Sequence, residues 1–273
     1  MTDFGLIGHP VGHSMSKVMH EAAFRHLDLE YTYGLFDVEE EELRLFMDNA
    51  NFLGLNVTIP LKTAVAGYMD ELSREASLIG AVNTVEFKDK RKVGYNTDSI
   101  GFARSLHEAG IDINDQTFLV LGTGGAARGI AFKLAMEKAR VYLYGRNTEK
   151  LKSLSEDVLD KVGVRVEPVG SIGDVIRKVD VLVNATSMGM YPNINESPVP
   201  SDLLYPLLKV VDVVYNPLET KLLADARALG CDTVDGAGML VHQGAESLRI
   251  WLGIEPPIEV MRQAVLDSLR TRA

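Results

Sequence analysis

The sequence predicts an α/β fold in two domains. Short runs rich in β-branched and aromatic residues alternate with segments whose apolar residues recur at helical spacing, which is typical of parallel strands joined by crossover helices. A glycine-rich turn at 122–127 stands between a strand pattern and a helix pattern, as in a Rossmann-type domain. The length of 273 residues suits two domains of roughly 150 residues each.

The first part of the chain is expected to form one α/β domain with a mostly parallel sheet. Its strands are predicted at five runs, the last of which closes a hairpin over residues 88–90: Phe4–Gly8, Tyr31–Phe36, Leu53–Thr58, Val82–Phe87 and Arg91–Tyr95. Apolar residues at helical spacing predict two covering helices, through 15–22 and 43–50. Asp37 and Glu40 are interpreted as the N-cap of the second helix and its reciprocal partner.

A second alternation predicts a second sheet, of Rossmann type, followed by closing helices. Its strands are expected at Phe118–Leu121, Val141–Tyr144, Val181–Asn184 and Val210–Val214. Helices through Met239–Trp251 and Ile258–Arg270 end the chain, and we expect them to pack back on the N-terminal domain. The first domain is therefore placed at residues 1–101, completed by 238–273, and the second at residues 102–237.

Composition and charge exclude several classes of protein. With 28 Lys and Arg against 38 Asp and Glu, the formal net charge of −10 repels phosphate backbones and anionic lipids, so neither a nucleic acid nor a membrane is expected as a partner. Cys231 is the single cysteine, which excludes an intrachain disulfide. The first residues lack the pattern of a signal peptide, and no histidine shows metal-ligand spacing. We expect a soluble, cytoplasmic protein without a metal.

The glycine-rich turn predicts a dinucleotide site. Gly122, Thr123, Gly124, Gly125 and Ala126 follow a strand. Such a turn lets the backbone approach a pyrophosphate at the N-terminus of the next helix. An ordinary glycine-rich turn is the alternative interpretation.

The residues after the next strand favour NADP over NAD. A domain that binds NAD carries an acidic residue at the end of that strand, whereas this chain has Arg146 and Lys150 there. Two cations suit the 2′-phosphate of NADP. The alternative is that both side chains are only solvated.

Polar residues also end the strands of the first domain, where ligands of α/β proteins usually bind. Ser14 and Ser16 open the first helix and suit a carboxylate or a phosphate, although Ser14 alone could be only an N-cap. Lys62 is predicted just inside a helix that begins near Pro60, where the helix dipole disfavours its charge and suits it to proton transfer. Further polar residues, which individually read as caps or turns, are Asn56, Thr58, Asn83, Thr84, Asn96, Thr97 and Asp98.

Eight motifs, in one order, resemble the shikimate dehydrogenase family. They lie between His9 and Leu248 and read HPVGHSMS, GLNVTIPLK, GAVNTV, GYNTD, LGTGGAARG, NATSMGM, VVYNPLET and GAGMLVHQGAESL. The resemblance implies reversible, NADP-dependent hydride transfer between 3-dehydroshikimate and shikimate, in the pathway to aromatic amino acids. It also implies a substrate domain and a Rossmann-type NADP domain.

The resemblance assigns roles to individual residues. Lys62 and Asp98 match the catalytic pair. The substrate carboxylate would bind Ser14 and Ser16, helped by Tyr215, and the ring hydroxyls would bind Thr58, Asn83 and Gln243. The implied cofactor contacts are Gly122, Thr123, Gly124, Gly125, Ala126, Arg146, Asn147, Lys150, Thr186, Ser187, Met188, Val213, Gly236 and Met239.

The sequence departs from the family pattern at a few positions. Lys17 replaces the usual proline after the second serine and is expected to point to solvent, Leu61 replaces a common histidine, and Ser99 replaces a glycine. Two alternatives share the framework. A quinate dehydrogenase usually prefers NAD, and a non-catalytic NADP-sensing module would be expected to lose Lys62 or Asp98. A monomer and a homodimer are both compatible with the sequence.

Overall fold

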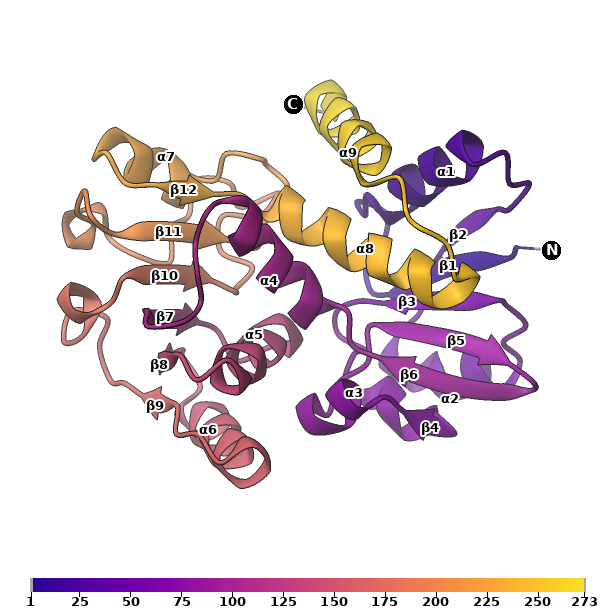
Figure 1. The fold of residues 1–273 in the computed structure, drawn as a ribbon, viewed down its shortest axis with the longest axis horizontal. Helices are drawn as coiled ribbons and strands as arrows, with labels where there is room; N and C mark the ends of the chain where they lie inside the picture. The colour runs from indigo at the N-terminus through magenta and orange to yellow at the C-terminus, as the bar shows by residue number, and fades with distance from the viewer. Residues whose placement is uncertain (1, 273) are drawn as a thin grey trace. The chain divides into compact units, whose positions relative to one another are not determined.

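The computed structural model describes residues 2–272 and confirms the α/β class (Figure 1). The chain divides into two compact units. The first unit contains the residues up to Gly101 together with Val241–Arg272, and the second contains Phe102–Leu240. Each unit is built on its own six-stranded sheet.

The first sheet is mixed, with parallel strands at its centre. Its strands are β1 (Phe4–Gly8), β2 (Tyr33–Asp37), β3 (Gly54–Val57), β4 (Glu71–Leu72), β5 (Thr84–Lys88) and β6 (Arg91–Tyr95), in the order β2-β1-β3-β5-β6-β4. Strand β1 pairs in parallel with β2 and β3, whereas β5 and β6 form an antiparallel hairpin beside β3. The carboxyl ends of β1, β2 and β3 therefore lie at one edge of the sheet.

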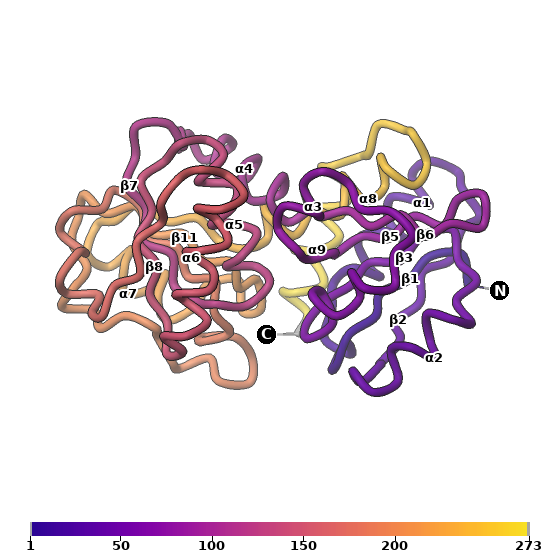
Figure 2. Tube along the Cα trace, turned by 90° about the horizontal axis from the view of Figure 1, so that it is seen from below, coloured from indigo at the N-terminus to yellow at the C-terminus, as the bar shows by residue number. Residues whose placement is uncertain are grey.

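The C-terminal helices pack back on the N-terminal unit, as predicted. The helices of this unit are α1 (Ser16–His26), α2 (Leu43–Asp48), α3 (Arg74–Ile79), the later part of α8 (Gly236–Leu252) and α9 (Ile258–Arg272). Helix α9 lies against α1, and Figure 2 shows the yellow C-terminal trace in the same unit as the indigo N-terminal trace. Trp251, at the end of α8, stacks on Phe4 with ring centroids 4.9 Å apart and donates from Nε1 to the carbonyl oxygen of Val85 at 3.0 Å.

Two local predictions in the first unit are wrong. Asp37 does not cap the second helix, because it ends β2 and its carboxylate contacts His9. The capping box is instead formed by Glu39 and Glu42 around a 3₁₀ turn. Lys62 does not lie in a helix, because the chain makes a turn there and a 3₁₀ helix starts only at Ala64.

Two short elements of the first unit were not predicted, β4 and α3. Helix α3 spans six residues, which is too short for its apolar periodicity to stand out from the sequence. It is nevertheless well bounded, because Ser73 accepts a hydrogen bond from the backbone nitrogen of Ala76 and Gly80 ends it with a φ of 69°.

The second unit is a doubly wound, all-parallel sheet. Its strands are β7 (Thr117–Leu121), β8 (Arg140–Tyr144), β9 (Glu167–Pro168), β10 (Val181–Asn184), β11 (Lys209–Asp212) and β12 (Thr233–Val234). Their order is β12-β11-β10-β7-β8-β9, and every pairing is parallel. This is the Rossmann order, in which the direction of winding reverses between β7 and β10. Ligands of such sheets bind beyond the carboxyl ends of the strands at that reversal.

Helices cover the second sheet and explain its apolar strands. The helices are the later part of α4 (Asp98–Glu108), α5 (Gly125–Met136), α6 (Thr148–Val162) and α7 (Lys221–Ala228). Leu119 and Leu121 of β7 belong to a core cluster with Leu222 and Leu223 of α7. Because successive side chains of a strand alternate between faces, Phe118 and Val120, also buried, face the other side of the sheet. No helix in the described part of the chain is long and apolar enough to cross a membrane.

The contact between Gly54 and Trp251 gives a test of the docking of α8. A Cβ atom at Gly54 would lie 2.3 Å from Nε1 and 2.4 Å from Cε2 of the indole, so Gly54→Ala should displace Trp251 and lower the free energy of unfolding by about 1–3 kcal/mol. Because Trp251 is the single tryptophan of the chain, its fluorescence reports the displacement directly, beside a thermal melt. Gly67→Ala is the control, since a Cβ there meets no atom within 4 Å. Equal melting temperatures and emission spectra for both variants would contradict this packing.

Candidate active site

The structure brings Lys62 and Asp98 into direct contact. Lys62 lies in the turn after β3, and Asp98 begins α4, yet Nζ of the lysine is 2.5 Å from Oδ2 of the aspartate. The side chains are only 14% and 6% exposed. The ion pair holds the two side chains against each other, and the remaining exposure of the lysine side chain leaves part of it open to a small ligand.

Asn83 holds the other oxygen of the Asp98 carboxylate. Its Nδ2 donates to Oδ1 of Asp98 at 2.9 Å and to Oγ1 of Thr97 at 2.9 Å. The same nitrogen lies 3.4 Å from Oε1 of Gln243, which is carried by α8. The structure therefore gathers Lys62, Asp98, Asn83 and Gln243 into one polar cluster, although Lys62 and Gln243 are 181 positions apart in the sequence.

The two serines of the first loop lie at the start of α1. Oγ of Ser14 donates to Oγ of Ser16 at 3.2 Å and accepts a hydrogen bond from the backbone nitrogen of Ser16 at 3.2 Å. Ser14 therefore does bond to the first turn, although Met15 occupies the N-cap position. Ser16 is 5% exposed and Ser14 is half-buried, so the hydroxyl of Ser14 is the more accessible of the two.

Close packing fixes the serine loop beside the turn that carries Thr58. The backbone nitrogen of His9 donates to the carbonyl oxygen of Ile59 at 2.9 Å. A Cβ at Gly8 would lie 2.4 Å from Cγ2 of Thr58, so only glycine permits this approach. The loops that follow β1 and β3 are therefore held side by side, at the same edge of the sheet as Lys62.

His9 and Asp37 form a contact that the sequence reasoning missed. Nδ1 of His9 lies 2.5 Å from Oδ1 of Asp37, and this hydrogen bond raises the pKa of His9 above its usual value. Asp37 ends β2, and His9 directly follows β1, the neighbouring parallel strand. The sequence did predict that both residues lie near strand ends. It did not give the pairing register of the two strands, which places the side chains next to each other. Lys17, as expected, is exposed, and its amine lies 3.8 Å from Glu21.

In the second unit, the glycine-rich turn has the predicted strand–turn–helix form. Strand β7 ends at Leu121, and α5 begins at Gly125. Gly122 has a φ of 120°, and a Cβ there would lie 2.8 Å from the carbonyl oxygen of Ala185, which follows β10. This close approach requires glycine and lies where the winding of the sheet reverses. Gly124 is exposed, so the backbone of the turn is open to a ligand.

The turn after β8 carries the two predicted cations. Arg146 and Lys150 are both exposed, and within the described residues neither forms an ion pair. The backbone nitrogen of Gly122 donates to the carbonyl oxygen of Tyr144 at 2.8 Å, which holds this turn next to the glycine-rich one. Asn147 caps α6, because its Oδ1 accepts from the backbone nitrogen of Lys150 at 2.9 Å. The arrangement can hold an anionic group at this edge.

A buried carboxylate organises the segments after β10 and β11. Asp212 accepts hydrogen bonds from Asn184 Nδ2 at 3.0 Å, from the backbone nitrogen of Val214 at 2.9 Å and from Thr220 Oγ1 at 2.7 Å. Burial raises the pKa of Asp212 to about 6, and these hydrogen bonds oppose that shift. Asn184 in turn accepts from Thr186 Oγ1 at 2.7 Å. Asp212 and Asn184 were not among the predicted site residues, although each is a polar residue that ends an apolar strand.

The remaining predicted cofactor residues of the second unit follow this carboxylate network. Thr186, Ser187 and Met188 form the loop after β10, where the carbonyl oxygen of Met188 accepts from Asn184 and its backbone nitrogen donates to Thr186. Val213 and Tyr215 follow β11, and both are half-buried. Gly236 and Met239 belong to the first turns of α8, where Met239 is buried.

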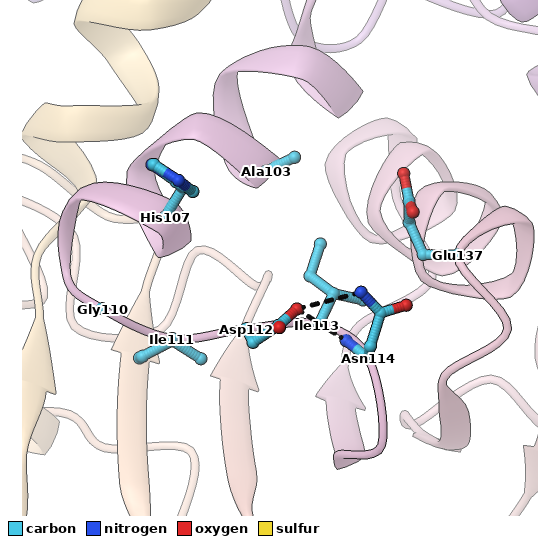
Figure 3. A pocket seen from close by; sticks show the side chains of 8 residues that line it. All are labelled: Ala103, His107, Gly110, Ile111, Asp112, Ile113, Asn114 and Glu137. Carbon is cyan, nitrogen blue, oxygen red and sulfur yellow. Dashed lines mark hydrogen bonds between the residues drawn. The ribbon is translucent and has the colours of Figure 1, made fainter.

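One cavity of about 390 Å³ is lined by none of these residues (Figure 3). Its lining includes His107 at the end of α4, the loop 110–114 and Glu137 after α5. These segments precede β7 and β8, so the cavity faces the amino ends of the strands rather than the glycine-rich turn. Figure 3 shows Asp112 bonded to Asn114, at 3.0 and 3.1 Å. In the described chain, no group of three or more His, Cys, Asp or Glu could hold a metal ion.

Comparison with known protein families covers most of the chain. Residues 6–85 match the model described as the shikimate dehydrogenase substrate binding domain, and residues 103–199 match shikimate / quinate 5-dehydrogenase. Residues 236–266 match the shikimate 5′-dehydrogenase C-terminal domain.

Individual relatives match over nearly their full length. The shikimate dehydrogenase (NADP(+)) of Methanopyrus kandleri is 48% identical, over 97% of this chain and 95% of the relative. A crystal structure of shikimate dehydrogenase in complex with NADP⁺ superposes with a TM-score of 0.92 at 41% identity, covering 98% of this chain and 96% of that one. The enzyme from Thermus thermophilus, in complex with NADP(H) and shikimate, gives a TM-score of 0.88 at 36% identity, covering 98% and 100%.

Two buried titratable groups give opposite pH dependences of stability. Burial lowers the pKa of His20 to about 3, so below about pH 6.5 the unfolded chain takes up a proton that the folded chain refuses. Stability should therefore fall as the pH drops from 6.5 toward 3, by about 1.4 kcal/mol per pH unit from this group. His20→Phe should flatten the measured curve of unfolding free energy against pH, because the substitution removes the titrating group.

Asp212 should act with the opposite sign. Its folded pKa of about 6 exceeds the ordinary 3.8, so between these values the folded state binds the proton more tightly and gains stability as the pH falls. Asp212→Asn should therefore make the acid loss of stability steeper. Chemical denaturation of the wild type and both variants at several pH values measures the three slopes. Identical slopes would contradict both assignments.

Proposed function

This chain belongs to the shikimate dehydrogenase family, and from that premise we propose that it oxidises shikimate to 3-dehydroshikimate reversibly with NADP⁺, in the pathway to aromatic amino acids. The observation that carries the proposal is the contact between Lys62 and Asp98, whose polar atoms are 2.5 Å apart at the ligand-binding edge of the first sheet. A module that had lost the chemistry would have no reason to keep this pair.

The pair suits the proton half of the reaction. Oxidation of a secondary alcohol removes a hydride from carbon and a proton from oxygen, and bound NADP⁺ supplies the hydride acceptor. The side chain of Lys62 is 14% exposed, more than that of Asp98, so we assign its amine to the contact with a substrate hydroxyl. Asp98 orients that amine while Asn83 fixes the carboxylate from its other side. The proton of the hydroxyl leaves to this pair as the C–H bond breaks, and the reverse reaction returns it.

We assign the binding of substrate to the first unit. The hydroxyls of Ser14 and Ser16 at the start of α1 suit the carboxylate, because helix N-terminal N–H groups and hydroxyl donors both favour an anion. Thr58 and Gln243 are assigned to ring hydroxyls, as is Asn83. Tyr215 belongs to the second unit, and its contact with the carboxylate stays a prediction of the resemblance.

We assign the binding of NADP to the second unit, whose residues fit that cofactor. The open backbone at Gly124 and the N-terminus of α5 suit the pyrophosphate. The exposed cations Arg146 and Lys150 suit the 2′-phosphate, whereas the acidic residue that NAD would require is missing from the sequence there. Residues 186–188, Val213, Gly236 and Met239 are assigned to the nicotinamide end, and the Asp212 network orders the first of these segments through Asn184.

Composition supports a proposal about the partners and the cellular location of the protein. The net charge of −10 supports a protein that acts on small molecules without binding nucleic acid, and the single cysteine supports a cytoplasmic location.

The direct experiment is reduction of NADP⁺ by purified protein with shikimate, run beside quinate and beside NAD⁺. Turnover of quinate with NAD⁺ at the higher kcat/KM would favour a quinate dehydrogenase instead, and no turnover of any pair would contradict an enzymatic function.

Removing either member of the pair should abolish most of the turnover. Lys62→Ala and Asp98→Asn should each lower kcat by about 10²- to 10⁴-fold, because positioned proton transfer is lost, while NADP binding persists. The double variant should be little slower than either single one, since both residues act on one proton. Steady-state kinetics with Lys17→Ala as the control measures this, because Lys17 is an exposed lysine of the same unit. A Lys62→Ala enzyme with the kcat of the control would remove the lysine from the mechanism.

Removing the arginine after β8 should change the choice of cofactor. Arg146→Ala should weaken binding of NADP⁺ by roughly tenfold to a hundredfold and leave NAD⁺ nearly unchanged, because only NADP⁺ has the 2′-phosphate. Arg140→Ala is the matched control, since Arg140 lies at the amino end of the same strand and stacks on Tyr142. Titration of both cofactors by fluorescence measures the change. Equal losses for the two cofactors would refute the role of Arg146.

A further inference from the structure

The orientation of the Asn83 amide is fixed by the backbone. The backbone nitrogen of Thr97 donates to Oδ1 of Asn83 at 2.7 Å, and a backbone N–H can only donate. The oxygen of the amide therefore faces Thr97, and Nδ2 faces Oδ1 of Asp98 at 2.9 Å. A rotated amide would place its oxygen against the carboxylate, which is electrostatically unfavourable. The position of Asp98 thus depends on what holds Asn83.

Three buried hydroxyls from different elements lie behind Asn83. They belong to Thr84 of β5, Thr97 before α4 and Ser247 of α8, and we call them the hydroxyl cluster. None is more than 1% exposed. Oγ1 of Thr84 lies 2.8 Å from Oγ of Ser247 and 3.1 Å from Oδ1 of Asn83. The cluster therefore connects the C-terminal helix to the amide that holds Asp98.

The donors and acceptors around the hydroxyl cluster can be assigned in order. The phenol of Tyr33 donates to Oδ1 of Asn56 at 2.7 Å, so Nδ2 of Asn56 is available and donates to Oγ of Ser247 at 2.9 Å. Ser247 accepts that hydrogen bond, and when its own hydrogen points at Oγ1 of Thr84, 2.8 Å away, Thr84 donates its hydrogen to Oδ1 of Asn83 at 3.1 Å. Each step joins buried side chains, so a missing hydroxyl cannot be replaced easily by water.

We propose that Ser247 and Thr84 are positioning residues for the Lys62–Asp98 pair. Neither hydroxyl forms a hydrogen bond with Lys62 or Asp98. Their hydroxyls hold the amide of Asn83, which presents Nδ2 to Asp98 and so fixes the carboxylate that orients the amine of Lys62. The inference rests on the proposed function, because positioning has a consequence only if the pair carries the proton transfer.

The alternative role of the cluster is to stabilise the fold alone. The single hydrogen of the Ser247 hydroxyl can instead point to the carbonyl oxygen of Gln243 at 3.0 Å, a common contact for a serine within a helix. If that contact were the whole role, Ser247→Ala would lower the melting temperature and leave kcat unchanged. A positioning role instead lowers kcat at unchanged affinity for NADP⁺, because the two units carry separate binding residues.

The experiment compares four variants by steady-state kinetics, NADP⁺ titration and thermal melting. Ser247→Ala and Thr84→Val remove the two hydroxyls and should each lower kcat by about tenfold to a hundredfold, as expected for a misplaced catalytic group. Thr84→Ser keeps the hydroxyl and loses only a methyl group, so it should retain the kcat of the wild type. Ser105→Ala is the control, because Ser105 is also buried within a helix and donates to the carbonyl oxygen of Phe102, at 2.8 Å, outside the cluster.

The outcomes separate the inference from the function on which it rests. Wild-type turnover that collapses in Lys62→Ala supports the function. On that background, a kcat of Ser247→Ala or Thr84→Val equal to that of Ser105→Ala would overturn the inference and leave the function standing. Equal losses in Thr84→Val and Thr84→Ser would also overturn it, because the methyl group would then be responsible. If Ser247→Ala fails to fold, the two Thr84 variants still decide the question.

Discussion

The contact between Lys62 and Asp98 is the constraint on which the first unit depends. Two ionisable side chains that are only 14% and 6% exposed lose most of their hydration, and other polar partners must compensate for that loss. The structure meets this demand with neutral polar side chains. Asn83 donates to the free oxygen of the carboxylate, and the backbone and hydroxyls behind Asn83 fix its direction. Burying so many polar groups lowers the free energy of unfolding unless all of them are hydrogen-bonded, so such a cluster supports a functional role.

The two units solve a similar problem with different chemistry. In the first, a lysine and an aspartate are held at the carboxyl edge of a mixed sheet. In the second, Asp212 is held at the carboxyl edge of a parallel sheet by three neutral donors and has no cation beside it among those bonds. Burial therefore raises the pKa of Asp212, and its network orders the backbone of the loops after β10 and β11. The cations of that unit are instead exposed at Arg146 and Lys150, where a phosphate can replace their hydration.

The sequence predicted the elements better than the contacts between them. Strands β1, β6 and β10 begin and end where the apolar runs and turn residues indicated, because both signals are local. The strand–turn–helix at the glycines was predictable for the same reason. The assignment of Asp37 as a cap failed because its true partner, His9, is 28 residues away and comes beside it only through the register of β1 and β2. Lys62 was misplaced in a helix because a proline and a lysine read equally well as a helix start and as a turn.

The return of the C-terminal helix to the first unit has a structural reason that the residues of α8 make explicit. Gln243, Ser247 and Trp251 are spaced four residues apart and so lie along one face of the helix. Each contacts a different position along the first sheet. Gln243 reaches Asn83, and Ser247 reaches Asn56 and Thr84. The indole of Trp251 lies over Gly54 and donates to the carbonyl oxygen of Val85. Along this face of α8, the side chains change from an amide to a hydroxyl to an aromatic ring with increasing distance from Asn83, which holds Asp98. Residues 1–101 alone would leave Asn56 and Thr84 without Ser247 and would expose the surface that Trp251 covers, so the substrate unit is complete only when the end of the chain has docked.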